Sequence, residues 1–393
     1  MEYRRFGRTE LRMPVFSCGG MRYQHKWQDI SWSEIPTEGQ ANVAATIERA
    51  LELGINHIET ARGYGSSEMQ LGQVLPTLPR EQIIVQTKVS PKADAQVFRQ
   101  TLEQSLDLLQ LDYVDLLGIH GINNAELLEQ TIRPGGCLAV AREFQAAGRV
   151  RFVGFSTHGS TQAICNAIAT DEFDYVNLHW YYINQFNWPA IAAAKAHDMG
   201  VFIISPSDKG GHLYNPPPKL TQLCQPLSPM VFNDLFCLSH PEVHTLSLGA
   251  ARPSDFDEHL KTLPLLAQAS EILAPILAKL EAEASQVLGE SWYHTWYHGL
   301  PDPGLDPSQV AVRTILWLSN LATAYDMMNY AQARYNLLGN ASHWFPGRRA
   351  EQIDATELQT LLQNSPHRES IPSRLAEAHQ MLGGKAVKRL SQQ

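Results

Sequence analysis

The sequence predicts an α/β protein: a closed (β/α)8 barrel of the TIM type with an N-terminal β-hairpin and an all-helical C-terminal extension. Short apolar runs alternate with helical patterns eight times over residues 1–265. These runs are continuously apolar, as parallel strands covered on both faces are. No G-x-G-x-x-G follows any of them, which argues against an open dinucleotide-binding sheet. We therefore divide the chain into a barrel domain, residues 1–265, and an extension, residues 266–393.

The elements of the barrel follow in order from the first residues. Residues 1–16 are expected to form a hairpin with a turn at Gly7-Arg8, leading into a strand that ends at 18–20. The other expected strands are 55–60, 83–88, 114–120, 152–156, 175–180, 201–205 and 245–249. The expected helices are 43–53, 67–75, 98–109, 138–147, 161–169, 189–197, 231–238 and 254–265. Apolar and β-branched residues indicate the strands, and 3.6-residue spacing indicates the helices.

The extension has a different pattern, in which only helices are expected. Residues 271–288 form an amphipathic helix that Gly289 ends, and a turn-rich stretch follows at 292–307. A long helix is expected over 309–338, then two shorter helical segments. Residues 385–389 form a basic end.

Composition excludes several classes of function. The net charge of −9 argues against a nucleic-acid-binding face. No uncharged apolar run reaches the ~20 residues of a membrane span, and the first residues do not resemble a signal peptide. The five cysteines are scattered and have no metal-ligand spacing. We therefore expect reduced thiols in a cytoplasmic protein with no membrane contact.

Residues 58–68, IETARGYGSSE, carry the most specific motif. They resemble the signature of the aldo-keto reductases, apolar-Asp-Thr-Ala-x-x-Tyr-Gly-x-Ser-Glu, with Glu59 where the family has Asp. Tyr64 is the motif's tyrosine. Lys88 and His120 end the third and fourth predicted strands, where the family has its lysine and histidine. Singly, each of these residues is usually structural. Together they lie at the C-terminal strand ends, where barrel enzymes carry their chemistry.

The resemblance implies an oxidoreductase that reduces an aldehyde or ketone with hydride from NAD(P)H. Tyr64 would then be the general acid, and Lys88 would lower its pKa from the ordinary value near ~10. Glu59 would hold Lys88, and His120 would orient the carbonyl group. Because Glu is one methylene longer than Asp, we expect an active but slow site.

The resemblance also implies a cofactor that lies extended across the barrel mouth. The residues at matching positions are Gly20, Met21, Ser156 with its neighbour Thr157, Asn177, Ser205, Lys209, Gly249, Arg252, Asp255 and His259. Arg252 beside a helix N-terminus could hold a 2′-phosphate, so NADPH is expected before NADH. A surface salt bridge is the alternative reading of Arg252.

A second function remains open, a non-catalytic NADP(H)-binding regulatory or sensor protein. The departures at Glu59, Asn177 and Asp255 from the family's residues favour it. A metal site is not expected, because His294 and His298 have no evident third ligand.

The extension resembles, in length and placement, the ferredoxin-like extension of one aldo-keto reductase subgroup. No cysteine follows Cys237, and iron–sulfur clusters need thiolate ligands, so no cluster is expected. Aromatic residues stand in its turn regions instead: Trp292, Trp296, Tyr297, Trp344 and Phe345. We expect aromatic packing there, and a role as a lid, a brace or a surface for a protein partner.

Overall fold

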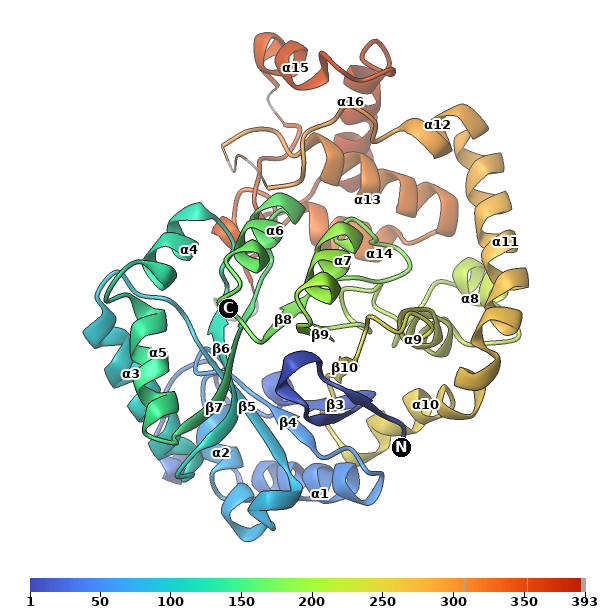
Figure 1. Ribbon diagram of the computed structural model, residues 1–393. Coiled ribbons are helices and arrows are strands. Elements are labelled where there is room, and N and C mark those ends of the chain that lie inside the picture. The colour runs from blue at the N-terminus through green and yellow to red at the C-terminus, as the bar shows by residue number, and fades with distance from the viewer. Residues whose placement is uncertain (305, 307, 352, 390–393) are drawn as a thin grey trace.

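The structure, a computed structural model, describes residues 1–304, 306, 308–351 and 353–389. Eight parallel strands close into a barrel with helices outside it (Figure 1). They are β3 (Phe16–Gly19), β4 (His57–Glu59), β5 (Ile84–Val89), β6 (Val114–His120), β7 (Val150–Ser156), β8 (Tyr175–Leu178), β9 (Gly200–Ile203) and β10 (Thr245–Leu248). β10 pairs with both β9 and β3, which closes the ring. The predicted barrel is confirmed.

The helices around the barrel follow the predicted alternation with differences in detail. They are α1 (Thr37–Glu52), α2 (Ser67–Leu71), α3 (Ala95–Leu109), α4 (Ala125–Ile132), α5 (Cys137–Ala146), α6 (Thr161–Ala169), α7 (Trp188–Ala196), α8 (Pro218–Cys224), α9 (Pro229–Leu238) and α10 (Asp257–Leu260). Helices α4 and α8 were not predicted. The N-cap of α4 was a usable signal, because the side chain of Asn124 accepts the backbone N–H of Leu127 at 2.9 Å.

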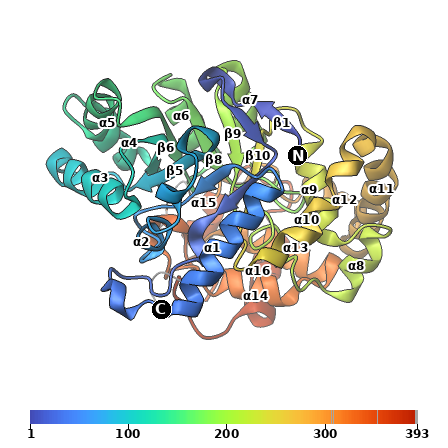
Figure 2. The same ribbon diagram turned by 90° about the horizontal axis from the view of Figure 1, so that it is seen from below.

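The hairpin closes the end of the barrel that is opposite the C-terminal strand ends. It pairs β1 (Tyr3–Arg5) with β2 (Arg12–Pro14) in antiparallel fashion, as predicted. Phe6 and Met13 of this region pack inside the barrel against residues near the strand starts, including Tyr175. Gly154 makes room for that ring, since a Cβ there would lie 2.5 Å from it. Figure 2 shows the hairpin on one side of the barrel and most of the extension on the other.

The extension lies against the loops at the C-terminal strand ends. Its helices are α11 (Ala269–Leu288), α12 (Glu290–Thr295), α13 (Val312–Tyr325), α14 (Met328–Tyr335), α15 (Ala355–Leu362) and α16 (Ile371–Leu382). Trp317 Nε1 donates to the carbonyl of Ile183 at 2.6 Å, and the Tyr330 hydroxyl donates to the carbonyl of Lys209 at 2.7 Å. These bonds anchor α13 and α14 to two barrel loops.

Three predicted boundaries at the end of the barrel domain and in the extension were wrong. The long helix over 309–338 is two helices, because Asp326 adopts a left-handed conformation with φ of 57° and ends α13. The turn-rich stretch begins with α12, and its residues 305 and 307 lie outside the described residues. The single helix expected over 254–265 is a set of short pieces: 3-10 turns η6 (Pro253–Phe256) and η7 (Leu263–Gln268) on either side of α10.

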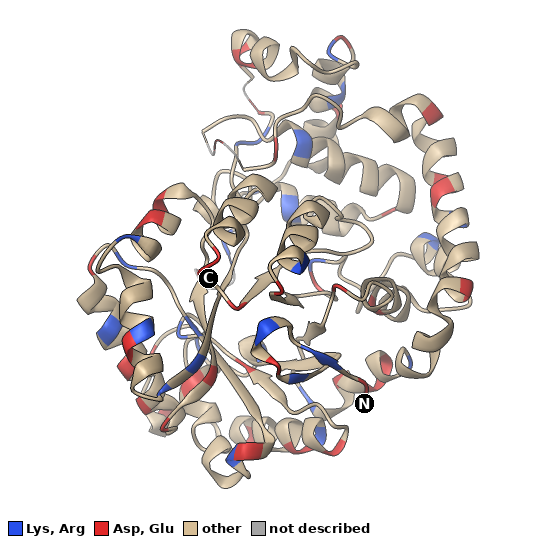
Figure 3. Cartoon of the chain, viewed as in Figure 1, with Lys and Arg blue, Asp and Glu red and all other residues tan. Residues whose placement is uncertain are grey.

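Charges of both signs are spread over the outer helices in the view of Figure 3. One helical stretch, 253–288, is long and apolar enough by composition to cross a membrane. This is weak evidence, because core helices of soluble proteins pass the same test, and here the stretch is broken into η6, α10, η7 and α11. Glu271, Lys279 and Glu281 stand exposed along α11.

Candidate active site

Neighbouring strand ends bring the four expected catalytic residues, Glu59, Tyr64, Lys88 and His120, to one mouth of the barrel. In the strand register Glu59 lies opposite Gln86, and Lys88 lies opposite Gly118. His120 ends β6, and Tyr64 lies on the turn between β4 and α2. Parallel strands in a closed barrel end at the same rim, so residues far apart in sequence meet there.

A buried ion pair forms the base of this site. Lys88 Nζ donates to Glu59 Oε2, and both side chains are almost fully buried. The same ammonium donates to the carbonyl of Thr60 at 2.7 Å, while Ser247 Oγ donates to Glu59 Oε1 at 2.9 Å. Both oxygens of the carboxylate are thus satisfied, which a buried pair requires. The longer carboxylate keeps Lys88 within the site.

Gly19 leaves the space that the Glu59–Ser247 hydrogen bond occupies. A Cβ on Gly19 would lie 2.7 Å from Ser247 Oγ and 3.1 Å from Glu59 Oε1. These distances are closer than ordinary contacts, so a larger residue would displace the pair. The longer side chain of Glu59 therefore has room beside Gly19 in β3, and its carboxylate has a hydrogen-bond donor, Ser247, in β10.

Tyr64 and His120 lie above the ion pair with their rings edge to face. Their centroids are 5.8 Å apart at 87°, and Lys88 Nζ lies 5.1 Å from the centroid of the Tyr64 ring. Burial and the Glu59 carboxylate raise the pKa of Tyr64 well above its usual value. Burial and then the Lys88 ammonium hold the pKa of His120 well below its usual range. The site thus presents a protonated phenol and a neutral imidazole.

The expected lowering of the Tyr64 pKa by Lys88 is not found. The ammonium lies over the ring and is neutralised by Glu59, so burial of the phenol outweighs it. The phenol is therefore protonated in the free protein, but its raised pKa makes it a weaker acid, since a general acid works best when its pKa lies near the operating pH.

Several of the expected cofactor residues lie around the same mouth. Asn177, at the end of β8, is fully buried, and neither its Nδ2 nor its Oδ1 has a hydrogen-bond partner. A buried primary amide without partners is costly, and a carboxamide such as that of nicotinamide offers the matching donor and acceptor. Ser156 lies opposite Asn177 in the register, and its Oγ accepts the N–H of Gly121 at 3.1 Å. These residues fit the nicotinamide end of a dinucleotide.

Backbone segments close to the barrel mouth also fit the nicotinamide end of a dinucleotide. Gly20 packs so tightly on β4 that a Cβ would lie 2.7 Å from the carbonyl oxygen of Glu59. Met21 follows in the 3-10 turn η2 (Gly20–Arg22) and is partly exposed. Ser205 lies two residues after the end of β9 and has a left-handed φ of 54°, and Gly249 is exposed after β10.

Four other expected residues have partners within the protein. The Thr157 hydroxyl donates to the carbonyl of Ile122 at 2.8 Å. His259 is buried, with Nδ1 2.5 Å from Asp234 Oδ2 and Nε2 3.4 Å from Ser207 Oγ. Asp255 caps its own loop by accepting the N–H of Ala251, and it also pairs with Arg252 at 3.0 Å. Arg252 precedes a four-residue 3-10 turn, where a helix had been expected.

Lys209 was expected on the phosphate side of the cofactor, but its ammonium turns elsewhere. Lys209 Nζ lies 3.3 Å from His179 Nε2, on the side of the mouth formed by the loops after β7 and β8. Arg22 is a cation that the sequence reasoning missed. A Cβ on Gly249 would lie 3.3 Å from Arg22 Nε, so this guanidinium lies along the loop where Arg252 was expected to act. The sequence could have pointed to Arg22, because it directly follows Met21, which was expected to contact the cofactor.

Two residues of the extension also reach the site. The Trp344 indole packs edge-on against His120, with centroids 5.3 Å apart, and closely covers Gly121. The Arg389 guanidinium lies 4.2 Å from the Trp344 ring and is close enough to Tyr64 to oppose the rise in its pKa. The expectation of Trp344 as an aromatic packing residue did not include this contact, since no short-range pattern links it to His120.

The Tyr64 phenol and the buried Lys88 ammonium thus lie together at the C-terminal strand ends of the barrel. Residues 17–211 match the family model described as Aldo/keto reductase family. The chain belongs to the aldo/keto reductase family, whose general cofactor is NAD(P)H.

Curated relatives and solved structures agree with this family. The chain is 29% identical over 165 residues to L-galactose dehydrogenase of Arabidopsis thaliana, covering 40% of this chain and 48% of the relative. It is 32% identical over 135 residues to the NADH-specific methylglyoxal reductase of Escherichia coli, covering 28% and 39%. The matched segment thus covers less than half of either relative. An aldo-keto reductase from Bacillus halodurans superposes with a TM-score of 0.58 at 19% identity, over 70% of this chain and 96% of that one, which shows the fold.

Proposed function

We propose that this protein reduces an aldehyde or ketone with hydride from NAD(P)H, and that Tyr64 is its general acid. The observation that carries the proposal is the buried Lys88–Glu59 pair beneath Tyr64, with His120 beside the phenol. Neither a structural tyrosine nor a structural histidine needs a buried ammonium, paired with a carboxylate, next to it.

Each of these residues has a distinct role in the proposed reduction. His120, neutral and a hydrogen-bond donor, orients the carbonyl oxygen toward the Tyr64 hydroxyl. Tyr64 donates its proton to that oxygen, and Lys88 stabilises the negative charge that then develops on the phenol. Glu59, held by Ser247, keeps the ammonium in place. When bound, the nicotinamide supplies the hydride, and Asn177 and Ser156 would hold its carboxamide.

The proposed cofactor preference is for NADPH. Arg252 is exposed, and its contact with Asp255 is a surface pair that costs little to break. Arg22 lies alongside the same loop, so two guanidinium groups are available to a 2′-phosphate. One relative is named NADH-specific, so the preference has to be measured on this chain.

The test is a titration of the purified protein with NADPH and NADH, followed by a panel of aldehydes and ketones. Binding of NADPH together with oxidation of NADPH by at least one carbonyl supports the proposal. Binding without turnover on any carbonyl would contradict it, and the absence of both would contradict every dinucleotide-dependent function.

One observation favours the second function, an NADP(H)-binding sensor. Trp344 covers one face of His120, and Arg389 lies close to Tyr64. A sensor would use the dinucleotide to change the position of the extension. Its signature would be a cofactor-dependent change in Trp344 emission, read by comparison with Trp344→Phe, without turnover.

A further inference from the structure

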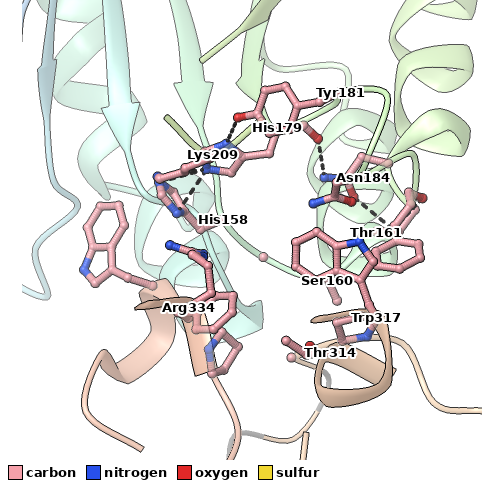
Figure 4. Close-up of a pocket in the computed structure, with 18 of the residues that line it drawn as sticks. His158, Ser160, Thr161, His179, Tyr181, Asn184, Lys209, Thr314, Trp317 and Arg334 are labelled. Carbon is pink, nitrogen blue, oxygen red and sulfur yellow. Dashed lines mark hydrogen bonds between the residues drawn. The ribbon is translucent and has the colours of Figure 1, made fainter. Parts of the chain in front are cut away.

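A cavity lies between the barrel and the extension, next to the proposed active site. The loops after β7 and β8 form one wall, and α13, α14 and the turn at 344–346 form the other (Figure 4). About 100 Å³ of it is open to a water-sized sphere, within about 760 Å³ of non-atom space that includes open solvent. Strands β7 and β8 lie across the barrel from β3, beyond which Met21 and Arg22 follow. The cavity therefore lies on the side of the mouth away from Met21 and Arg22, next to the strand ends where Ser156 and Asn177 would hold the nicotinamide.

Four nitrogen-bearing side chains converge on this cavity. His158, His179 and Lys209 come from the barrel loops, and Arg334 comes from α14 (Figure 4). His179 Nε2 lies 3.2 Å from His158 Nδ1 and 3.3 Å from Lys209 Nζ. Among the described residues that line the cavity there is no aspartate or glutamate. Burial and then the Lys209 ammonium hold the pKa of His158 and of His179 well below the usual range, so the positive charge of the cavity comes from Arg334 and Lys209.

The positive groups are not neutralised by the protein around them. Arg334 packs on the Phe345 ring at 4.0 Å, and its buried Nε has no hydrogen-bond partner. Burial and the nearby Arg334 lower the pKa of Lys209 to about 7, and Asp208 opposes this only in part. Repulsion of this kind between buried cations is unfavourable unless an anion is bound between them.

Trp344 joins the cavity to the proposed catalytic groups. Its indole lines the cavity, with its centroid 4.9 Å from that of His158 and 5.3 Å from that of His120. A short carbon chain laid along this indole would have one end at His120 and Tyr64 and the other end among the four nitrogens.

We propose that the cavity is the binding site for an anionic group of the substrate, a carboxylate or a phosphate, so that the protein prefers anionic aldehydes or ketones to neutral ones. The inference rests on the proposed reductase function for its kinetic meaning, but not for the existence of the anion site. Arg334 and Lys209 supply charge-assisted hydrogen bonds to the anion, and Trp344 supports the carbon chain.

Calorimetry of anion binding tests the site without any reaction. The full-length protein is titrated with succinate and with inorganic phosphate, and the variants are Arg334→Gln and Lys209→Met. Each should weaken binding roughly tenfold to a hundredfold, since each removes a charged hydrogen bond. The control is Arg374→Gln: Arg374 stacks on Trp292 at 3.8 Å in α16, outside the cavity, and its loss should leave anion binding unchanged.

Kinetics with matched substrates tests the assignment to the substrate. Succinic semialdehyde and butanal share a four-carbon chain and differ in the carboxylate. Arg334→Gln and Lys209→Met should each lower kcat/KM for the semialdehyde roughly tenfold or more, and leave butanal within about twofold. NADPH affinity should not change. Melting temperatures of the two variants, compared with that of Arg374→Gln, show whether the fold is kept. Because the two substitutions lie on different elements, the test still holds if one of the variants misfolds.

The outcomes separate cleanly. Unchanged anion binding in both folded variants would overturn the inference, as would equal losses for both aldehydes. A parallel loss of NADPH affinity would assign the cavity to the nucleotide's phosphates and also overturn it. If no carbonyl is reduced, the proposed function fails, and calorimetry alone then decides the anion site.

Discussion

Glu59 is the residue at which the chain departs most clearly from the family motif, and its surroundings accommodate the longer carboxylate. Ser247 donates to one carboxylate oxygen, Lys88 donates to the other, and Gly19 leaves the space. The sequence predicted the pairing of Glu59 with Lys88. It could not predict the roles of Gly19 and Ser247, which lie on β3 and β10 and meet Glu59 only once the barrel closes.

Shortening this carboxylate should lower activity modestly. Glu59→Asp cannot reach both Lys88 and Ser247, but it keeps the charge, and Lys88 keeps the carbonyl of Thr60. We expect kcat to fall by about tenfold or less. Glu59→Gln leaves the ammonium buried without a counter-charge, which should cost about 3–5 kcal/mol of folding free energy and most of the activity. Steady-state kinetics and denaturant unfolding measure both. A faster Glu59→Asp enzyme would show that Glu is merely tolerated.

The pH dependence of the reaction follows from the environments of Tyr64 and His120. The pKa of Tyr64 is raised, so the phenol keeps its proton as pH rises toward 10 and beyond. The pKa of His120 is lowered, so the imidazole stays neutral as pH falls to 6.5 and below. Reduction of a neutral aldehyde should therefore be nearly flat between about pH 7 and 9. An activity loss with a midpoint inside that window would contradict these assignments.

At the scale of elements, the strands were easier to predict than the loops that build the site. Short apolar runs located β4, β5 and β6, and therefore Glu59, Lys88 and His120 at their ends. The loops have no such periodicity. The direction of Lys209 toward His179, and of Arg22 toward Gly249, depends on packing between segments far apart in the sequence.

The loops after β3 and β10 should set the cofactor preference. Arg252→Ala and Arg22→Ala should each weaken NADPH more than NADH, by roughly tenfold, because each removes a guanidinium from the proposed 2′-phosphate site. Asp255→Asn keeps the acceptor for the Ala251 N–H but removes a negative charge, so it should hold or raise NADPH affinity. Fluorescence titration with both dinucleotides measures this. Equal losses for the two dinucleotides would remove the 2′-phosphate argument.

At the scale of the whole molecule, the extension is part of the catalytic end of the barrel. Its helical character and aromatic content could be predicted from the sequence. Its placement could not, because Trp344 meets His120 and Gly121 over more than two hundred residues of intervening chain. The wrong prediction of one long helix over 309–338 has a local cause, the left-handed Asp326 between α13 and α14.

Removing the extension should expose apolar surface on both parts. A chain ending at Gln268 loses the partners of Ile183, Phe186 and the β7 and β8 loops. We expect lower solubility and a lower melting temperature than the full chain. A chain ending at Gly383 removes Arg389 but keeps all the described helices, and should remain folded. A barrel alone that is as stable as the full chain would show that the extension is not needed to cover this surface.

The central claim is that Tyr64 donates the proton in an NAD(P)H-dependent carbonyl reduction. The measurement that tests it most directly is NADPH oxidation by the best carbonyl of the panel, at saturating cofactor, for the wild type and Tyr64→Phe. The account predicts loss of about a hundredfold or more in kcat with the dissociation constant for NADPH within about twofold, because the phenol acts on the substrate oxygen alone. Tyr64→Phe with wild-type turnover would contradict it.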